Sequence, residues 1–281
     1  MLPTVRARRS TAALVTIATF LLLLSALIRP VSAANPTPRI INGHPAAFGA
    51  YPFMAALLLT DVSGSDFDRQ YCGGSLIAPR WVLTAAHCAD FLTGPSEVAV
   101  AVGRSDLDST QGVRIAIRSI HIHPDWDPKK LSPDVALLEL ATPVTTITPI
   151  QLATGANNNF EAAGTPLTVI GWGNLDTRNG HATFPDALHE VVVPAVTDTA
   201  CAKIYHKFLV QATMLCAGAP GLDSCQGDSG GPIFATTATG VRIQMGIVSW
   251  GQGCAKNHFV GVYGEVNSPT IRTFIQQTAG V

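Results

Sequence analysis

A glycine-rich segment around Ser229 is the part of the sequence most suited to chemistry. It reads DSCQGDSGGPIF from Asp223 to Phe234. Glycine and proline favour turns and close backbone approach, so Ser229 is predicted to lie in a turn rather than inside a helix or strand. A serine there could be a nucleophile if another residue accepts its proton. The alternative is an ordinary polar turn.

The order of residues along the chain separates two kinds of serine hydrolase. GDSGG also matches Gly-x-Ser-x-Gly, the nucleophile turn of α/β-hydrolases, in which an acid and then a histidine follow the serine. After Ser229 the only acid is Glu265 and the only histidine is His258, which stand in the wrong order. The sequence therefore argues against that arrangement and against an apolar esterase.

A histidine and an aspartate upstream complete another arrangement. LTAAHC supplies His87 and DVALLEL supplies Asp134. An imidazole can take the proton of a serine hydroxyl, and a carboxylate can hold that imidazole in one tautomer. The order His, Asp, Ser occurs in known triads. His87 alone could be structural and Asp134 alone a turn carboxylate, but their joint occurrence with Ser229 favours a triad.

Short strands must bring these residues together. Apolar or alternating runs follow one another at intervals of about ten residues, separated by Gly, Pro, Asn and Asp, which indicates an all-β sandwich or pair of barrels. Residues 154–164 are polar and turn-rich and are the best candidate for a linker between two halves. One clear helix is predicted at the end, where Ser268 can cap and Pro269 suits the first turn. The runs read FMAALLL, SLIAPRWVLTAAHC, EVAVAVG, VRIAIRSIHI, DVALLEL, PLTVIGWG, HEVVVPAV, GPIF, RIQMGIVSW and FVGVYGEV.

Composition points to a compact globular protein of one or two domains. The 281 residues are 47% hydrophobic and 13% charged, which does not suit a disordered chain. Residues 1–39 hold five arginines and no acid, and the remainder holds 13 basic and 19 acidic residues, a formal charge of −6. This balance gives no reason to expect a nucleic-acid or anionic-membrane partner.

The first 33 residues are predicted to be a signal peptide. They have a basic start, an apolar stretch and a small-residue site ending at Ala33. The alternative is a signal anchor, because the apolar stretch is nearly long enough to span a membrane. We expect a secreted, extracellular protein with no membrane contact after the signal is removed.

The six cysteines are even in number, and export permits disulfides. Zinc is the competing use, but no Cys-x-x-Cys pair occurs. Six cysteines allow 15 connectivities, so spacing alone leaves the pairing open.

Several motifs together resemble the chymotrypsin-like serine proteases, and specifically their trypsin-like branch. The resemblance covers residues 40–281 and implies two six-stranded antiparallel β-barrels with the active site between them, the first at about 40–155 and the second at about 156–281. The motifs that carry it are IING, YCGGSLIAPRWVLTAAHC, SPDVALLEL, GWG, MLCAG, DSCQGDSGGP, SWGQGC and GVY.

The resemblance assigns the catalytic roles. Ser229 is the nucleophile, His87 the base and then acid, and Asp134 the orienting carboxylate. The backbone N–H groups of Gly227 and Ser229 form the oxyanion hole, where glycine keeps side chains away from the substrate. The resemblance also implies three disulfides, namely Cys72–Cys88, Cys201–Cys216 and Cys225–Cys254.

The resemblance also implies the specificity. A carboxylate at Asp223 forms the floor of the pocket for the side chain before the scissile bond and selects Arg or Lys by charge. The expected partners are protein or peptide substrates with Arg or Lys at that position, with protein protease inhibitors as further candidates, and the enzyme is expected to be a monomer. The remaining pocket residues are expected to be Ser224, Ser249, Trp250, Gly251 and Gly261, and Tyr205 also fits the pattern.

A zymogen is expected, with residues 34–39 as an activation propeptide. Cleavage of the Arg39–Ile40 bond would create an ammonium group on Ile40, and a buried Asp228 would need such a cation. The alternative is a flexible leader without this role.

Three departures from the family pattern limit the carry-over. Val260 replaces the residues usual before Gly261, so no sodium site is expected. Arg104 stands where calcium-binding trypsins carry a glutamate, and the loop through Gln111 is short, which argues against calcium there. The segment CAGAPGLDSC is also shorter than in digestive trypsins.

No cofactor is expected. The alternative function is a catalytically silent binding module, although His87, Asp134 and Ser229 are all present.

Overall fold

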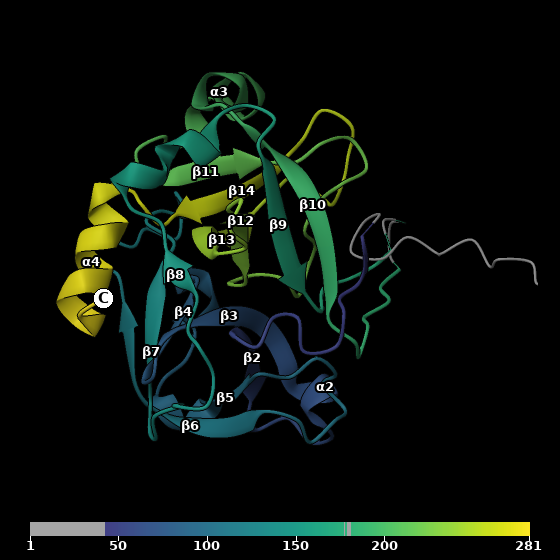
Figure 1. Cartoon of the computed structure of the whole chain (residues 1–281), viewed down its shortest axis with the longest axis vertical. Helices are drawn as coiled ribbons and strands as arrows, with labels where there is room; N and C mark the ends of the chain where they lie inside the picture. The colour runs from purple at the N-terminus through teal and green to yellow at the C-terminus, as the bar shows by residue number, and fades with distance from the viewer. Residues whose placement is uncertain (1–42, 177, 179–180) are drawn as a thin grey trace, which may run out of the picture. The chain divides into compact units, whose positions relative to one another are not determined.

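Antiparallel strands form most of the structure, a computed structural model that describes residues 43–281 except 177 and 179–180 (Figure 1). The predicted signal peptide, the propeptide, Arg39 and Ile40 lie outside the described residues. Among the described residues, no helix is long and apolar enough to cross a membrane.

The first barrel closes in the order β2-β3-β4-β7-β6-β5. Some of its strands alternate apolar and polar residues, and others are wholly apolar because both faces of the sheet pack against protein there. The five residues VAVAV of β5, for example, are all buried. The strands are β2 Met54–Leu59, β3 Gln70–Ala78, β4 Trp81–Thr84, β5 Val98–Val102, β6 Val113–Ile122 and β7 Ala136–Leu140.

The second barrel runs β10-β11-β14-β13-β12-β9 and closes through the pairing of β10 with β9. Two further strands, β1 His44–Pro45 and β8 Gln151–Leu152, pair with β10 and β13 from outside the barrel. The predicted fold class, two closed six-stranded antiparallel barrels, is confirmed. The barrel strands are β9 Pro166–Gly171, β10 His189–Val196, β11 Met214–Ala217, β12 Pro232–Thr236, β13 Arg242–Trp250 and β14 Gly261–Glu265.

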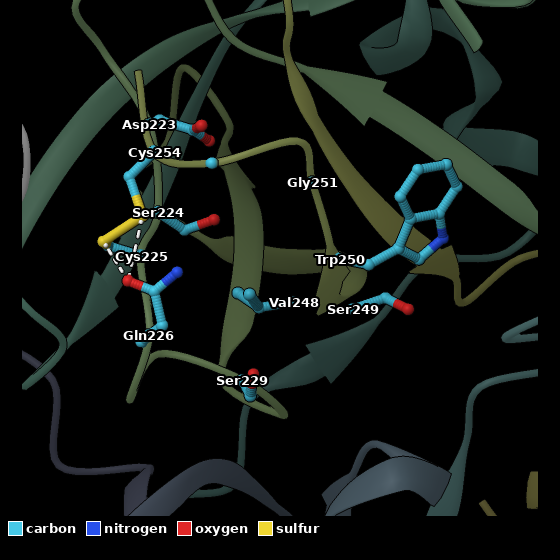
Figure 2. Close-up of a pocket in the computed structure, with 11 residues that line it drawn as sticks. Asp223, Ser224, Cys225, Gln226, Ser229, Val248, Ser249, Trp250, Gly251 and Cys254 are labelled. Carbon is cyan, nitrogen blue, oxygen red and sulfur yellow. Dashed lines mark hydrogen bonds between the residues drawn. A yellow bond between two sulfur atoms is a disulfide. The ribbon is translucent and has the colours of Figure 1, made fainter. Parts of the chain in front are cut away.

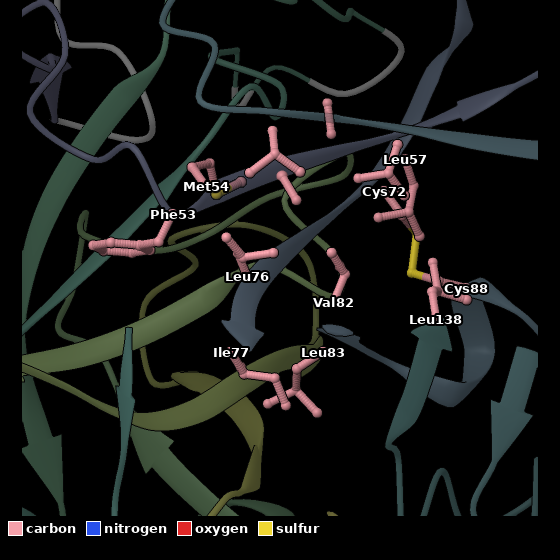
Figure 3. Packing of buried hydrophobic residues seen from close by; sticks show 14 of the residues in the cluster. Phe53, Met54, Leu57, Cys72, Leu76, Ile77, Val82, Leu83, Cys88 and Leu138 are labelled. Carbon is pink, nitrogen blue, oxygen red and sulfur yellow. A yellow bond between two sulfur atoms is a disulfide. The ribbon is translucent and has the colours of Figure 1, made fainter. Parts of the chain in front are cut away.

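Apolar cores fill both barrels, and the cluster of the first barrel continues into the second at Phe234 and Ile247. The core of the first barrel contains Leu57, Leu76 and Leu138, and the Cys72–Cys88 disulfide lies within this cluster (Figure 3). The second core includes Val169 and Met245, both fully buried. The two cores allow both barrels to hold their shape while loops at their ends carry polar residues.

Polar and aromatic contacts join the barrels. Ser75 Oγ of β3 donates a buried hydrogen bond of 2.7 Å to Gln244 Oε1 of β13. The rings of Phe53 and Phe234 meet edge to face with centroids 5.8 Å apart. These contacts fix the ends of the two barrels against each other.

Short helices lie in the connections between strands. The predicted linker contains a 3₁₀ helix, η3 Gly155–Glu161. Helix α3 was not predicted, although Thr197 before it accepts a bond from the N–H of Ala200 as an N-cap does. The other helices are η1 Ala86–Cys88, η2 Pro95–Glu97, α2 Asp66–Arg69, α3 Asp198–Tyr205, η4 His206–Phe208 and α4 Pro269–Ala279.

Helix α4 begins at the predicted residue, but the cap differs from expectation. Ser268 occupies the N-cap position without a capping hydrogen bond from its side chain. Its hydroxyl donates instead to the carbonyl oxygen of Ala212 at 2.7 Å. The serine thus ties the helix to the preceding barrel rather than satisfying the first turn.

A guanidinium group fills the short loop in which calcium was not expected. Arg104 Nε donates to the carbonyl oxygen of Gln111 at 3.0 Å, and Nη1 pairs with the carboxylate of Asp66 on α2. Both side chains are more than nine-tenths buried, whereas Arg114, which lies 3.0 Å from the other oxygen of Asp66, is 39% exposed. The loop is therefore held by an internal cation.

Replacing Arg104 should cost more stability than replacing Arg114. Arg104→Ala leaves a buried carboxylate with one exposed partner, and we expect the free energy of unfolding to fall by about 3 kcal/mol. Arg114→Ala removes an exposed pair and should cost less than about 1 kcal/mol. Urea denaturation of both variants measures the difference, and equal losses would contradict this account of the loop.

Candidate active site

Strand pairing places His87 beside Asp134. Strands β4 and β7 pair antiparallel with Thr84 opposite Ala136, so the residues after β4 and before β7 emerge at the same end of the barrel. His87 Nδ1 lies 2.7 Å from Asp134 Oδ2, and the backbone N–H of His87 donates to Asp134 Oδ1 at 3.0 Å. Two contacts from one residue fix the imidazole relative to the carboxylate.

The second barrel also contacts Asp134. Ser249 Oγ, near the end of β13, donates to Asp134 Oδ2 at 2.5 Å. Asp134 is 2% exposed, so these donors replace the water that its charge would otherwise need. The sequence assigned Ser249 to the substrate pocket, and the structure adds this contact with the carboxylate.

The pKa of His87 lies above its ordinary value. Burial alone lowers this pKa, but the hydrogen bond to Asp134 and the negative charges of Asp134 and Asp90 raise it by more. These contacts stabilise the protonated imidazole, which is the form that a histidine takes when it accepts a proton as a general base.

Glycines allow the turn of Ser229 to dock on the first barrel. Gly230 has φ +78°, and a Cβ atom there would lie 2.2 Å from Thr84 Oγ1. The carbonyl oxygen of Ser229 accepts a hydrogen bond of 2.7 Å from Gly73 N of β3. The turn therefore lies against Thr84, which stands three positions before His87.

The structure does not join Ser229 directly to His87. Although both residues are described, no hydrogen bond links Ser229 Oγ to His87 Nε2, and that nitrogen lies 3.7 Å from Cys88 Sγ. Hydrogen bonds of this kind are often long or misaligned without substrate. The serine turn therefore lies near the histidine loop, but the side chains of Ser229 and His87 are not hydrogen-bonded to each other.

Gly227 takes a backbone conformation that favours glycine. Its φ is +97°, and its carbonyl oxygen accepts a hydrogen bond of 2.9 Å from Gln70 Nε2. A Cβ atom at this position would approach Gly173 Cα to 3.0 Å. Gln70, which the sequence reasoning missed, thus helps to hold the turn that precedes Ser229.

A pocket of about 200 Å³ connects Ser229 with Asp223. Figure 2 shows Asp223 at one end and Ser229 at the other, with Trp250 at the side. Gly261 faces Asp223, since a Cβ atom there would lie 2.9 Å from Asp223 Oδ1. The structure thus gathers the pocket residues named from the sequence, the others being Ser224, Ser249 and Gly251.

Asp223 presents one unsatisfied oxygen. The side chain is 4% exposed, and Oδ2 accepts a hydrogen bond of 3.0 Å from Ala255 N. Oδ1 is buried without a hydrogen-bond partner among the described residues. Burial raises the pKa of Asp223 to about 6, against the lowering effect of backbone donors at Ala255 and Ser224. A cation entering the pocket would satisfy this oxygen.

Asp228 is fully buried beside the pocket. Its oxygens accept hydrogen bonds of 2.8 Å from the N–H groups of Gly173 and Cys225. Cβ atoms at Gly171 and Gly173 would lie within 2.1 and 2.4 Å of the carboxylate, so the GWG sequence makes room for it. Burial raises the pKa of Asp228 to about 7, and no cation among the described residues pairs with it.

Three disulfides brace these loops. Cys72–Cys88 links β3 to the His87 helix, and Cys225–Cys254 links the serine loop to the far rim of the pocket. The third, Cys201–Cys216, joins α3 to β11. The single cluster of metal-ligand types found among the described residues, Cys72, His87 and Cys88, contains two disulfide sulfurs, which are not thiolate ligands.

Comparison with known proteins agrees with this architecture. The profile of the family described as Trypsin matches residues 40–275. The chain is 40% identical to a trypsin-like protease of Streptomyces glaucescens, over 88% of this chain and 85% of that one. It is 37% identical to a trypsin of Sarcophaga bullata, over 86% and 89%. It is 35% identical to a trypsin of Saccharopolyspora erythraea, over 82% and 94%.

Proposed function

The chain belongs to the trypsin family of serine proteases, and we propose that it is a secreted endopeptidase that cleaves peptide bonds after Arg or Lys. The observation that carries the proposal is the buried Asp134 carboxylate, which accepts two hydrogen bonds from His87 beside the turn of Ser229. This arrangement suits a triad in which the aspartate orients the base.

The reaction proceeds through an acyl-enzyme. Ser229 Oγ attacks the scissile carbonyl carbon while His87 Nε2 takes the hydroxyl proton. His87 then gives that proton to the leaving amine as the C–N bond breaks. Water, deprotonated by His87, then attacks the ester carbonyl carbon, and His87 returns the proton to Ser229 Oγ as the acyl–oxygen bond breaks and the acid is released. The N–H groups of Gly227 and Ser229 stabilise the oxyanion, and the positive φ of Gly227 supports that role.

Asp223 sets the specificity. Its partnerless buried oxygen favours a substrate cation because an ion pair offsets the cost of burying the carboxylate. The pocket, about 200 Å³ in volume, has room for a long side chain that reaches from Ser229 to Asp223. Arg and Lys meet both conditions.

Cleavage after Arg39 activates the enzyme. Residues 1–33 are the signal peptide, 34–39 the propeptide and 40–281 the peptidase, whose two barrels divide near residue 155. The new ammonium group of Ile40 pairs with Asp228, which is buried without a cation among the described residues. The pair orders the turn of Gly227 and the adjacent pocket. The mature enzyme acts as a monomer on protein or peptide substrates, and protein protease inhibitors compete for the same site.

Substitution of Ser229 tests the reaction. Ser229→Ala should lower kcat/KM by about four to six orders of magnitude with the fold intact, because the nucleophile is lost. A fluorophosphonate should label wild-type enzyme once and the variant not at all. The control is Ser63→Ala, an exposed serine outside the site. A Ser229→Ala protein that keeps a tenth of the activity would exclude this mechanism.

Substitution of Asp223 tests the specificity. Asp223→Ser should reduce kcat/KM for Arg peptides by at least about 100-fold, because the substrate cation loses a buried partner. Benzamidinium requires the ionised carboxylate, so its affinity for wild-type enzyme should fall as pH decreases through about 6. Calorimetric titration measures this dependence, with the exposed Asp61→Ser as control. Equal cleavage after Phe and Arg would overturn the assignment.

Substitution of Arg39 tests the activation. Arg39→Gln should accumulate as an inactive precursor that begins near Ala34, because the bond no longer follows a basic residue. Arg39→Lys, the matched control, should still be processed. N-terminal sequencing of active wild-type enzyme should begin at Ile40. Full activity in a form that still begins near Ala34 would refute the activation mechanism.

A further inference from the structure

A second cavity, larger than the pocket of Asp223, adjoins it. Its volume is about 500 Å³, and Trp250 lines both. The cavity brings together the loop between β6 and β7 and the segment at and after η4, which lie in different barrels. The residues that matter for its chemistry are Lys129, Lys130, Leu131, Lys207, Phe208 and Trp250.

Three of the five lysines in the sequence line this one cavity. They gather there although residues 40–281 carry a formal charge of −6. Lys130 Nζ lies 3.3 Å from the carboxylate of Asp127, and Lys207 Nζ lies 5.5 Å from the ring centroid of Phe208. Neither Lys129 nor Lys207 forms an ion pair with an acidic side chain among the described residues. The cavity is therefore a local positive site on an acidic protein.

Two aromatic side chains, Trp250 and Phe208, also line the cavity. The indole of Trp250 packs edge to face on Tyr205, with centroids 4.8 Å apart. Phe208 is 62% exposed at the rim. Aromatic surface and cationic groups in one cavity suit an extended peptide, whose backbone and methylenes contact the rings while acidic ends reach the ammonium groups.

The position of Trp250 indicates which part of a substrate reaches the lysines. His87 protonates the leaving amine, so the residues after the scissile bond run past His87. Trp250 lines both the pocket and the cavity, so a substrate chain that passes over its indole carries the residues before the bond toward the lysines. An extended chain advances about 3.3 Å per residue, so a cavity that shares Trp250 with the pocket is within reach of the few residues before the bond.

We propose that the cavity formed by Lys129, Lys130 and Lys207 around Trp250 binds acidic side chains of the substrate, two to four residues before the scissile bond. The inference rests on the proposed endopeptidase function and narrows it. The preferred substrates are then segments in which Asp or Glu shortly precede the Arg or Lys that enters the pocket of Asp223.

Paired peptides test this preference in the full, activated enzyme. Quenched fluorogenic peptides with one Arg carry either Glu or Gln at each position from four before to three after the bond. We expect kcat/KM to favour Glu over Gln about fivefold or more at positions before the bond, as one or two ion pairs allow. The preference should shrink between about 0.02 M and about 0.5 M salt because exposed charges are screened.

Lysine variants test whether the cavity causes the preference for Glu over Gln peptides. In the triple variant Lys129→Gln, Lys130→Gln and Lys207→Gln, the ratio of kcat/KM for the Glu peptide to that for the Gln peptide should fall to about one. Lys203→Gln, an exposed lysine of α3 that does not line the cavity, should leave the ratio unchanged. Fluorescence anisotropy of the same peptides with Ser229→Ala protein gives their Kd without turnover and should show the same ratio.

The outcomes separate the two proposals. Cleavage after Arg at equal rates for Glu and Gln peptides would overturn the cavity assignment and leave the proposed function standing. A preference that survives the triple variant, or that appears only at positions after the bond, would also overturn it. Failure to cleave any Arg peptide would overturn the proposed function and the inference together.

Discussion

The buried carboxylate of Asp134 is the interaction on which the rest of the site depends. It accepts hydrogen bonds from His87 in the first barrel and from Ser249 in the second. A charge that is 2% exposed is costly without such donors. Because one of the donors comes from the second barrel, the carboxylate receives all three hydrogen bonds only when the barrels are docked, and docking also presents the turn of Ser229 to the histidine loop.

The carboxylates of Asp228 and Asp223 are also buried, and each offsets the cost of losing water in a different way. Asp228 accepts two backbone hydrogen bonds inside a space left by Gly171 and Gly173. Asp223 has one oxygen satisfied by Ala255 and one without a partner among the described residues. In both, burial raises the pKa and leaves a demand for positive charge. We attribute the first demand to the proposed activated terminus and the second to the substrate.

The sequence predicted the barrel strands well because their apolar runs are bounded by glycine and proline. It also placed the start of α4, but not the contact of Ser268 with Ala212, since the spacing of residues along a chain does not show which distant carbonyl a hydroxyl will meet. Helix α3 was missed because its eight residues have only a short apolar stripe, with Cys201 and Tyr205 as the buried positions. Gln70 beside Gly227 has no local signal, because its role depends on a residue 157 positions away.

The hydrogen bond from Gly73 N to the carbonyl oxygen of Ser229 crosses from one barrel to the other. The serine turn is thus completed by a strand that comes more than 150 residues earlier in the chain. During synthesis, the first barrel can form before the serine has left the ribosome, and neither barrel alone holds the full set of contacts. A copy whose two barrels have not yet docked therefore lacks part of the arrangement around Ser229.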